Sequence, residues 1–77
     1  MNQNDLIVLS AIHSLVFDKQ LPTHVDAESI TKVSGLSFEE TQTSLKSEFI
    51  ANCPGAEVHY GSNRVTDVSL STDFNNV

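Results

Sequence analysis

The side chains that could bind a metal ion or act as nucleophiles are few and widely separated. The soft ligands are His13, His24, Cys53 and His59. A zinc site needs such ligands in closely spaced pairs, and these four residues form no such pair. Cys53 follows a predicted helix end, where carbonyl groups raise a thiol pKa, so we expect it to be a packing residue. The sequence therefore predicts no metal site.

The patterns for nucleotide binding or acid–base catalysis are also missing. Gly35, Gly55 and Gly61 are isolated glycines, and the sequence contains no GxxxxGK[ST] run. Glu39 and Glu40 are neighbours and diverge by about 100 degrees around a helix, which makes them poor partners for proton transfer. We therefore expect no enzymatic activity and no cofactor.

Charge limits the partners of this chain. Ten acidic side chains oppose four basic ones, which gives a net charge of −6 over 77 residues. Such a chain repels polyanions, including nucleic acid and anionic membranes. The basic residues are scattered singly along the sequence, at Lys19, Lys32, Lys46 and Arg64. We therefore expect no nonspecific binding to nucleic acid through phosphate neutralisation.

Length and cysteine content predict one small domain in a reducing compartment. A secreted domain of 77 residues would usually contain several disulfides, but this chain has one cysteine. We therefore expect a cytoplasmic protein. The apolar stretch 6–17 lacks the preceding positive charges of a signal peptide and is shorter than the roughly 20 residues of a membrane span, so we assign it to the fold.

Hydrophobic periodicity predicts a first helix over 4–17 and a second helix over 26–34. Asp26 can cap the second helix, and Gly35 suits the left-handed residue that ends it. A proline between the two helices predicts a loop over 18–24.

A third helix is predicted from a capping box. The Ser37 hydroxyl can accept a hydrogen bond from the Glu40 N–H, while the Glu40 carboxylate accepts one from the Ser37 N–H. The helix is expected to continue to about Asn52, where Pro54 and Gly55 stop it. Its predicted buried side consists of Phe38, Thr41, Leu45 and Phe49.

The last third of the chain alternates polar with apolar residues, which is typical of strands. Two strands, 57–60 and 64–70, flank a Gly-Ser-Asn turn and predict a hairpin. The residues after Ser71 lack a pattern, so we expect one domain over 1–72 and a disordered tail over 73–77. The predicted class is mainly α with a C-terminal β-hairpin.

Three helices, a tight turn before the third and a following hairpin resemble the winged helix-turn-helix superfamily. The similarity covers about residues 4–71, and its most specific part is the run Ile30–Leu45, ITKVSGLSFEETQTSL. The resemblance implies three helices plus a two-stranded wing, with the third helix in the place of the recognition helix. It also implies a role in transcription regulation.

The predicted recognition helix carries the wrong charge for reading DNA. Lys, Arg, Asn or Gln are the useful groups in its first turns, but this chain has Glu39 and Glu40 there. Capping and the helix dipole can account for both carboxylates. We therefore favour a regulatory module that binds a protein partner, and its sharper form is an inhibitor that mimics nucleic acid. The interacting residues would be the acidic side chains Glu28, Glu39, Glu48 and Glu57.

A sequence-specific DNA-binding transcription regulator is the alternative function. Its reading residues would be Gln42, Thr43 and Lys46 on the third helix. Arg64, at the tip of the wing, could enter a minor groove.

The first helix is more apolar than a single packed helix needs, since nine of the twelve residues 6–17 are apolar. This excess predicts a homodimer through this helix, with Ile7, Val8 and Ala11 at the interface. The alternative is a monomer in which the loop over 18–25 folds back and covers the remaining face.

Overall fold

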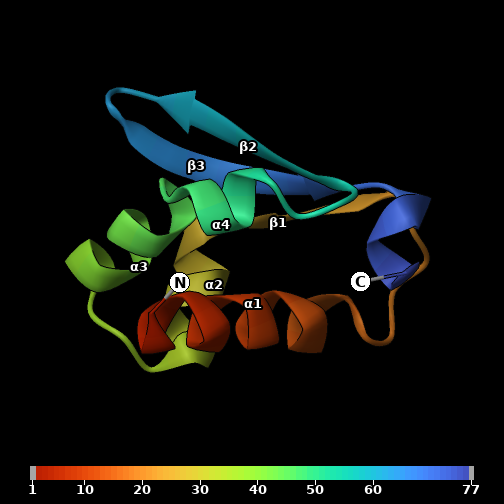
Figure 1. Cartoon of the computed structure of the whole chain (residues 1–77), viewed down its shortest axis with the longest axis horizontal. Coiled ribbons are helices and arrows are strands. Elements are labelled where there is room, and N and C mark those ends of the chain that lie inside the picture. The colour runs from red at the N-terminus through yellow and green to blue at the C-terminus, as the bar shows by residue number, and fades with distance from the viewer. Residues whose placement is uncertain (1, 77) are drawn as a thin grey trace.

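Helices cover one face of a three-stranded antiparallel sheet (Figure 1). The computed structural model describes residues 2–76, with side chains up to Phe74. The elements in chain order are α1 (Gln3–Val16), β1 (Thr23–Asp26), α2 (Ala27–Ser34), α3 (Phe38–Leu45), α4 (Glu48–Ala51), β2 (Ala56–Gly61), β3 (Arg64–Leu70) and the 3-10 helix η1 (Thr72–Asn76). The strand order is β1-β3-β2, so β3 is central. The predicted C-terminal hairpin is confirmed as β2 and β3, but the prediction of three helices and two strands is wrong in both counts.

Strand β1 lies where the sequence predicts a loop. It pairs antiparallel with β3, from Thr23 opposite Leu70 to Asp26 opposite Asp67. Four residues are too few to show a clear alternation, and the strand depends on hydrogen bonds to a segment near the other end of the chain. The pairing turns Val25 into the core, where it is buried.

The predicted helix caps are present. Asp26 accepts a hydrogen bond from the Ser29 N–H at 2.8 Å. Ser37 and Glu40 form the reciprocal capping box, with distances of 3.0 and 3.1 Å. Gly35 ends α2 with a φ of 74°, a left-handed conformation that glycine adopts without steric cost. Asp26 therefore sets the start of α2, and Gly35 and Ser37 set the two ends of the α2–α3 connection.

Two of these caps make stability pH-dependent. Hydrogen bonds from the side chain and backbone of Ser29 lower the pKa of Asp26, and those from the backbone and side chain of Ser37 lower the pKa of Glu40. A carboxyl group with a lowered pKa in the folded state stabilises the fold above its ordinary pKa of about 4, and this stabilisation is lost as the pH falls through the folded value.

We therefore expect the double variant Asp26→Asn/Glu40→Gln to lose less stability than the parent between about pH 5 and about pH 2. Its side chains keep hydrogen-bonding groups at both caps but do not titrate in this range. Urea unfolding at a series of pH values measures the difference. Parallel pH profiles for the two proteins would contradict it.

Helix α3 ends at Leu45, and the prediction that it continues to Asn52 is wrong. Ser47 interrupts it with extended backbone angles, φ −74° and ψ 157°, before α4 begins. The Ser47 hydroxyl donates to the Ser44 carbonyl at 2.7 Å, and such local bonds compete with the next helical turn. After the break, α4 brings Ile50 into the core.

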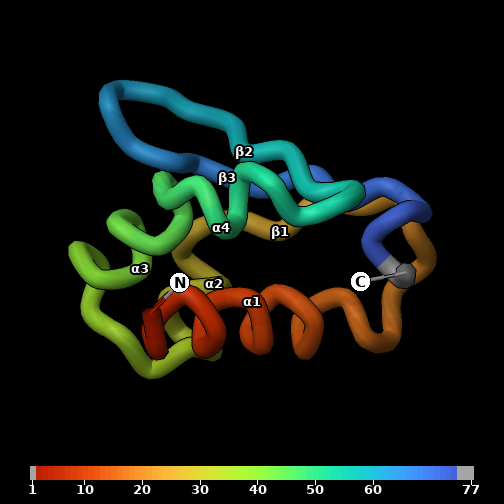
Figure 2. The backbone as a smooth tube through the Cα atoms, in the orientation of Figure 1, coloured from red at the N-terminus to blue at the C-terminus, as the bar shows by residue number. Residues whose placement is uncertain are grey.

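The C-terminal segment packs against the end of α1. Phe74 in η1 is 1% exposed, and its ring stacks on His13 with the ring centroids 4.4 Å apart. Figure 2 shows this return of the chain to α1. Gly55 permits it, because a Cβ there would collide with the backbone nitrogen of Phe74. The prediction of a disordered tail over 73–77 does not hold at Phe74, and the side chains of residues 75–77 lie outside the described part.

The buried side of α1 is narrower than its composition suggests. It consists of Asp5, Val8, Ala11, Ile12 and Val16. Leu6 and Phe17 are instead 48% and 89% exposed. Val8 is fully buried within the chain itself, so the prediction that it forms a dimer interface is wrong at this position. Ala11 is 2% exposed and Ile7 is half-buried. Among residues 2–76, no helix combines the length and apolar character needed to cross a membrane.

Candidate functional site

Gln42, a predicted DNA-reading residue, is buried between α3 and β3. It is 5% exposed, its Nε2 donates to the Val65 carbonyl at 2.9 Å, and its Oε1 accepts from the Val65 N–H at 2.8 Å. β1 stops at Asp26, opposite Asp67, and does not extend alongside Val65. The Gln42 amide therefore satisfies two backbone groups that a longer β1 would satisfy. The predicted DNA-reading role does not hold for Gln42, because both ends of its amide are used inside the chain.

Lys46 is also engaged within the chain. Its Nζ donates to the Asn63 carbonyl at 3.1 Å, which ties the end of α3 to the turn of the hairpin that projects beyond the helices (Figure 2). Ser62 and Asn63 have φ values of 54° and 66°, the geometry of a tight two-residue turn. Thr43 and Arg64, the other two members of the predicted DNA-reading set, are exposed.

The four acidic residues predicted to bind a partner lie on four different elements. Glu28 on α2 forms an exposed ion pair with Lys32 at 3.6 Å. Glu39 and Glu48 are exposed in the first turns of α3 and α4, and Glu57 is exposed on β2. Glu28 and Glu57 line separate depressions, so the four carboxylates do not share one surface.

A groove of about 570 Å³ lies between α2, the first turn of α3 and the start of β3. We call it the α2–hairpin groove, and its lining includes Ala27, Glu28, Lys32, Phe38, Arg64 and Val65. Ala27 and Val65 are buried at its floor, so Phe38 supplies most of the exposed apolar side-chain surface of the groove. Phe38 was expected on the buried side of the third helix, but it is 51% exposed at this groove.

The groove also gathers charges that are scattered in the sequence. Lys32 and Arg64 lie on the same groove as the carboxylates of Asp26 and Glu28. Packing of α2 beside the start of β3 brings these residues together. The groove therefore combines an apolar lining with charges of both signs.

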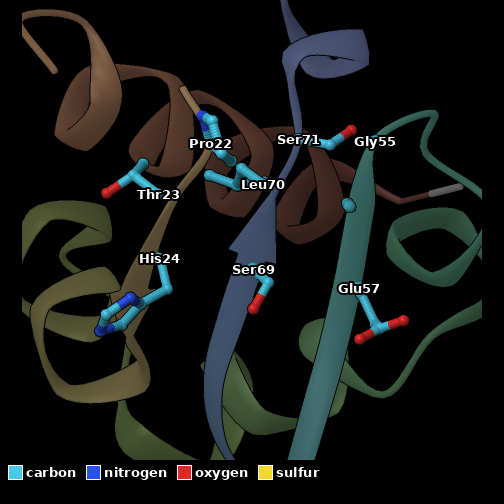
Figure 3. Close-up of a pocket in the computed structure, with 9 residues that line it drawn as sticks. Pro22, Thr23, His24, Gly55, Glu57, Ser69, Leu70 and Ser71 are labelled. Atoms are coloured by element: carbon cyan, nitrogen blue, oxygen red, sulfur yellow. The ribbon is translucent and has the colours of Figure 1, made fainter. Parts of the chain in front are cut away.

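A second depression of about 570 Å³ lies on the outer face of the sheet (Figure 3). His24, Ser69 and Glu57 lie side by side on β1, β3 and β2, because the register pairs both outer residues with Ser69. His59 Nε2 is 2.7 Å from Ser69 Oγ and 3.5 Å from Glu57 Oε1. In a Ser-His-acid triad the hydroxyl and the carboxylate bind opposite ring nitrogens, whereas both groups here approach Nε2. This geometry is that of a polar surface network and not of a proton relay.

The thiol is also in an environment that disfavours its ionisation. Cys53 is half-buried, and its Sγ donates to the Phe49 carbonyl at 3.3 Å. Burial raises the pKa of the Cys53 thiol, so the reactive thiolate is disfavoured. Within the described residues 2–76, no three His, Cys, Asp or Glu side chains come together as metal ligands.

Sequence reasoning identified part of the α2–hairpin groove and missed the rest. Glu28 and Arg64 were expected to contact partners, in two different hypotheses, and both line this groove. Phe38 was missed because it lies three residues before the buried Thr41, so that periodicity places it inward. The available signal in the sequence was that Phe38 directly follows the N-cap Ser37, because side chains in the first turn of a helix lie near its end.

The chain matches no protein-family model, and neither the curated proteins nor the solved structures contain a match. The assignment of function therefore depends on the geometry of the groove and of the residues around α3.

Proposed function

We propose that this chain is a protein-binding module of the winged helix-turn-helix type, and that its α2–hairpin groove holds an apolar side chain of a partner protein. The observation that carries the proposal is Phe38, a half-exposed aromatic side chain beside an apolar groove lining. Aromatic residues and arginine are enriched at the centres of protein interfaces, and Arg64 lies on the same groove.

The fold type is supported by the elements that carry the resemblance. Helix α2, the left-handed Gly35, the capped helix α3 and the β2–β3 hairpin follow one another in the expected order. By this analogy α3 is in the place of the recognition helix and the hairpin is in the place of the wing.

The size of the groove suits a side chain of a partner. Its volume of about 570 Å³ lies within the range of about 300–1,000 Å³ that is common for ligand sites. An apolar anchor packed against the exposed ring of Phe38 would remove apolar surface from water, which is the main driving force of association. We therefore infer that the partner contributes a large apolar side chain.

The charges around the groove define what flanks that anchor. Glu28 and Asp26 are negative, whereas Lys32 and Arg64 are positive. Charges at the rim of an interface contribute mainly to orientation and to the rate of association. The partner segment should therefore carry charges of both signs beside its apolar anchor.

The DNA-reading alternative has weaker support. Gln42 is buried and its amide is bonded to the backbone of Val65, which removes it from the predicted reading residues. Lys46 uses one of its three N–H donors on the hairpin turn. The exposed first turn of α3 presents Glu39 and Glu40, and these carboxylates would lie close to phosphates. The nucleic-acid-mimicking form of the protein-binding hypothesis is also weakened, because its carboxylates are dispersed over four elements.

The variant Phe38→Lys is expected to lose the partner. The tagged full chain is expressed in its own host, co-purified proteins are identified by mass spectrometry, and the affinity of the purified partner is then measured by calorimetry. Loss of a central aromatic residue costs about 2 kcal/mol or more, so binding should weaken at least about 30-fold.

Tyr60→Lys is the matched control, because Tyr60 is an aromatic residue on β2 with a similar exposed fraction of 59%. It should retain the partner. Parental affinity in Phe38→Lys would contradict the proposal. Micromolar binding of the parent to a random DNA duplex at about 150 mM salt, measured by fluorescence anisotropy, would favour nucleic-acid binding instead.

A further inference from the structure

A second groove, with a volume of about 290 Å³, lies between α1 and the end of α2. Leu6 is half-exposed on one side of it, and Val33, which is 49% exposed, lies on the other. Ile7 also lines the groove and is half-buried. We call this the α1–α2 groove. In Figure 1, α1 forms the side of the molecule opposite the sheet, so this surface is separate from the hairpin.

The lining of the α1–α2 groove carries no ionisable side chain among the described residues. The α2–hairpin groove, the outer sheet face and a smaller depression beside β1 each contain ionisable residues. The chain as a whole has a net charge of −6. Two copies of an acidic chain repel each other, and an uncharged contact surface avoids burying like charges face to face. The same surface offers no charge complementarity that would select a basic partner.

The side chains along α1 also fit a helix pair. Leu6, Ser10 and Ser14 are exposed and lie four residues apart, so they form one row on the helix surface. In an antiparallel pair centred on Ser10, Leu6 of one copy lies opposite Ser14 of the other. A large side chain then meets a small one on both sides of the twofold axis, so two large side chains do not clash there.

We propose that the α1–α2 groove is the interface of a symmetric homodimer, in which α1 of one copy packs antiparallel against α1 of the other. Leu6 and Val33 are the apolar contacts, and the serine hydroxyls of the row can bond across the axis. This goes beyond partner binding at the α2–hairpin groove, and the two surfaces can be tested separately.

Sedimentation velocity over a wide concentration range tests the dimer. The average mass should rise from 8.4 kDa towards twice that value. A single pair of helices buries little surface, so we expect a dissociation constant of about 10–100 µM. A mass that stays at 8.4 kDa up to about 1 mM would overturn the proposal.

The variants Leu6→Lys and Val33→Lys locate the interface. Each should raise the dissociation constant by about 10-fold or more, because two lysines would be buried across the axis. Phe38→Lys is the matched control: its side chain is about as exposed but lies on the other groove, so its dimer should be unchanged. Circular dichroism verifies that each variant is folded.

Concentration-dependent amide shifts of the parent provide a second measurement that needs no variant. They should concentrate on Leu6, Ser10 and Val33. A dimer that persists in both lysine variants, or shifts confined to the hairpin, would overturn the proposal. If Phe38→Lys loses the partner but keeps the dimer, both proposals are supported. If Leu6→Lys keeps the partner but loses the dimer, the two surfaces act separately and partner binding at the α2–hairpin groove still holds.

Discussion

Phe74→Ala is expected to lower the free energy of unfolding by about 3–5 kcal/mol, the usual cost of removing a buried aromatic ring. Phe74 is fully enclosed and stacks on His13 of α1. Alanine would leave a cavity between η1 and α1 and release the segment that packs there. The total stability of a domain of this size is about 4–12 kcal/mol, so this single change should remove a large part of it. Urea unfolding followed by circular dichroism measures the loss.

Phe17→Ala is the matched control for this prediction. The residue type is the same, but the Phe17 side chain is almost fully exposed after the end of α1. Its removal should change the free energy of unfolding by less than about 0.5 kcal/mol. If Phe74→Ala lost as little stability as Phe17→Ala, the C-terminal segment would not belong to the core.

Gln42→Leu is expected to lower the free energy of unfolding by about 2–4 kcal/mol. Leucine has a similar volume, but it leaves the Val65 N–H and carbonyl without the two hydrogen bonds that Gln42 makes. Each buried backbone group that loses its partner costs about 1–3 kcal/mol. Hydrogen exchange should also show faster exchange of the Val65 amide, because this amide is then no longer protected.

Thr43→Ala tests whether that loss is specific. Thr43 is the exposed neighbour of Gln42 on the same helix, so its replacement should change stability by no more than about 0.5 kcal/mol. A Gln42→Leu protein with parental stability and a protected Val65 amide would show that the amide bridge is not needed for the fold.

Local sequence determined where α2 and α3 begin and how they are connected. Asp26, the box of Ser37 with Glu40, and the left-handed Gly35 all act within three or four residues of their partners. Their effects depend on hydrogen bonds and backbone angles that the chain forms locally, so they could be predicted without the fold. The hairpin turn is of the same kind, since Ser62 and Asn63 occupy it with positive φ.

The candidate site could be predicted only in part. Glu28 and Arg64 were identified by their charge, which is visible in the sequence. The convergence of Lys32 and Phe38 with them depends on how α2 and α3 pack beside β3. The same packing hid the role of Gln42, because an amide on a helix surface suits a DNA base and a strand backbone equally well.

The tertiary structure alone decided which segments complete the sheet and the core. β1 is a strand because β3 offers it a hydrogen-bonding edge. Gln42 is buried because β1 does not extend along β3 as far as Val65, which leaves the Val65 backbone for the Gln42 amide. Phe74 is a core residue because Gly55 leaves space for its backbone. Each of these contacts joins residues far apart in the chain. Periodicity and capping report the preferences of neighbouring residues, whereas such contacts become favourable only when folding has brought the distant segments together.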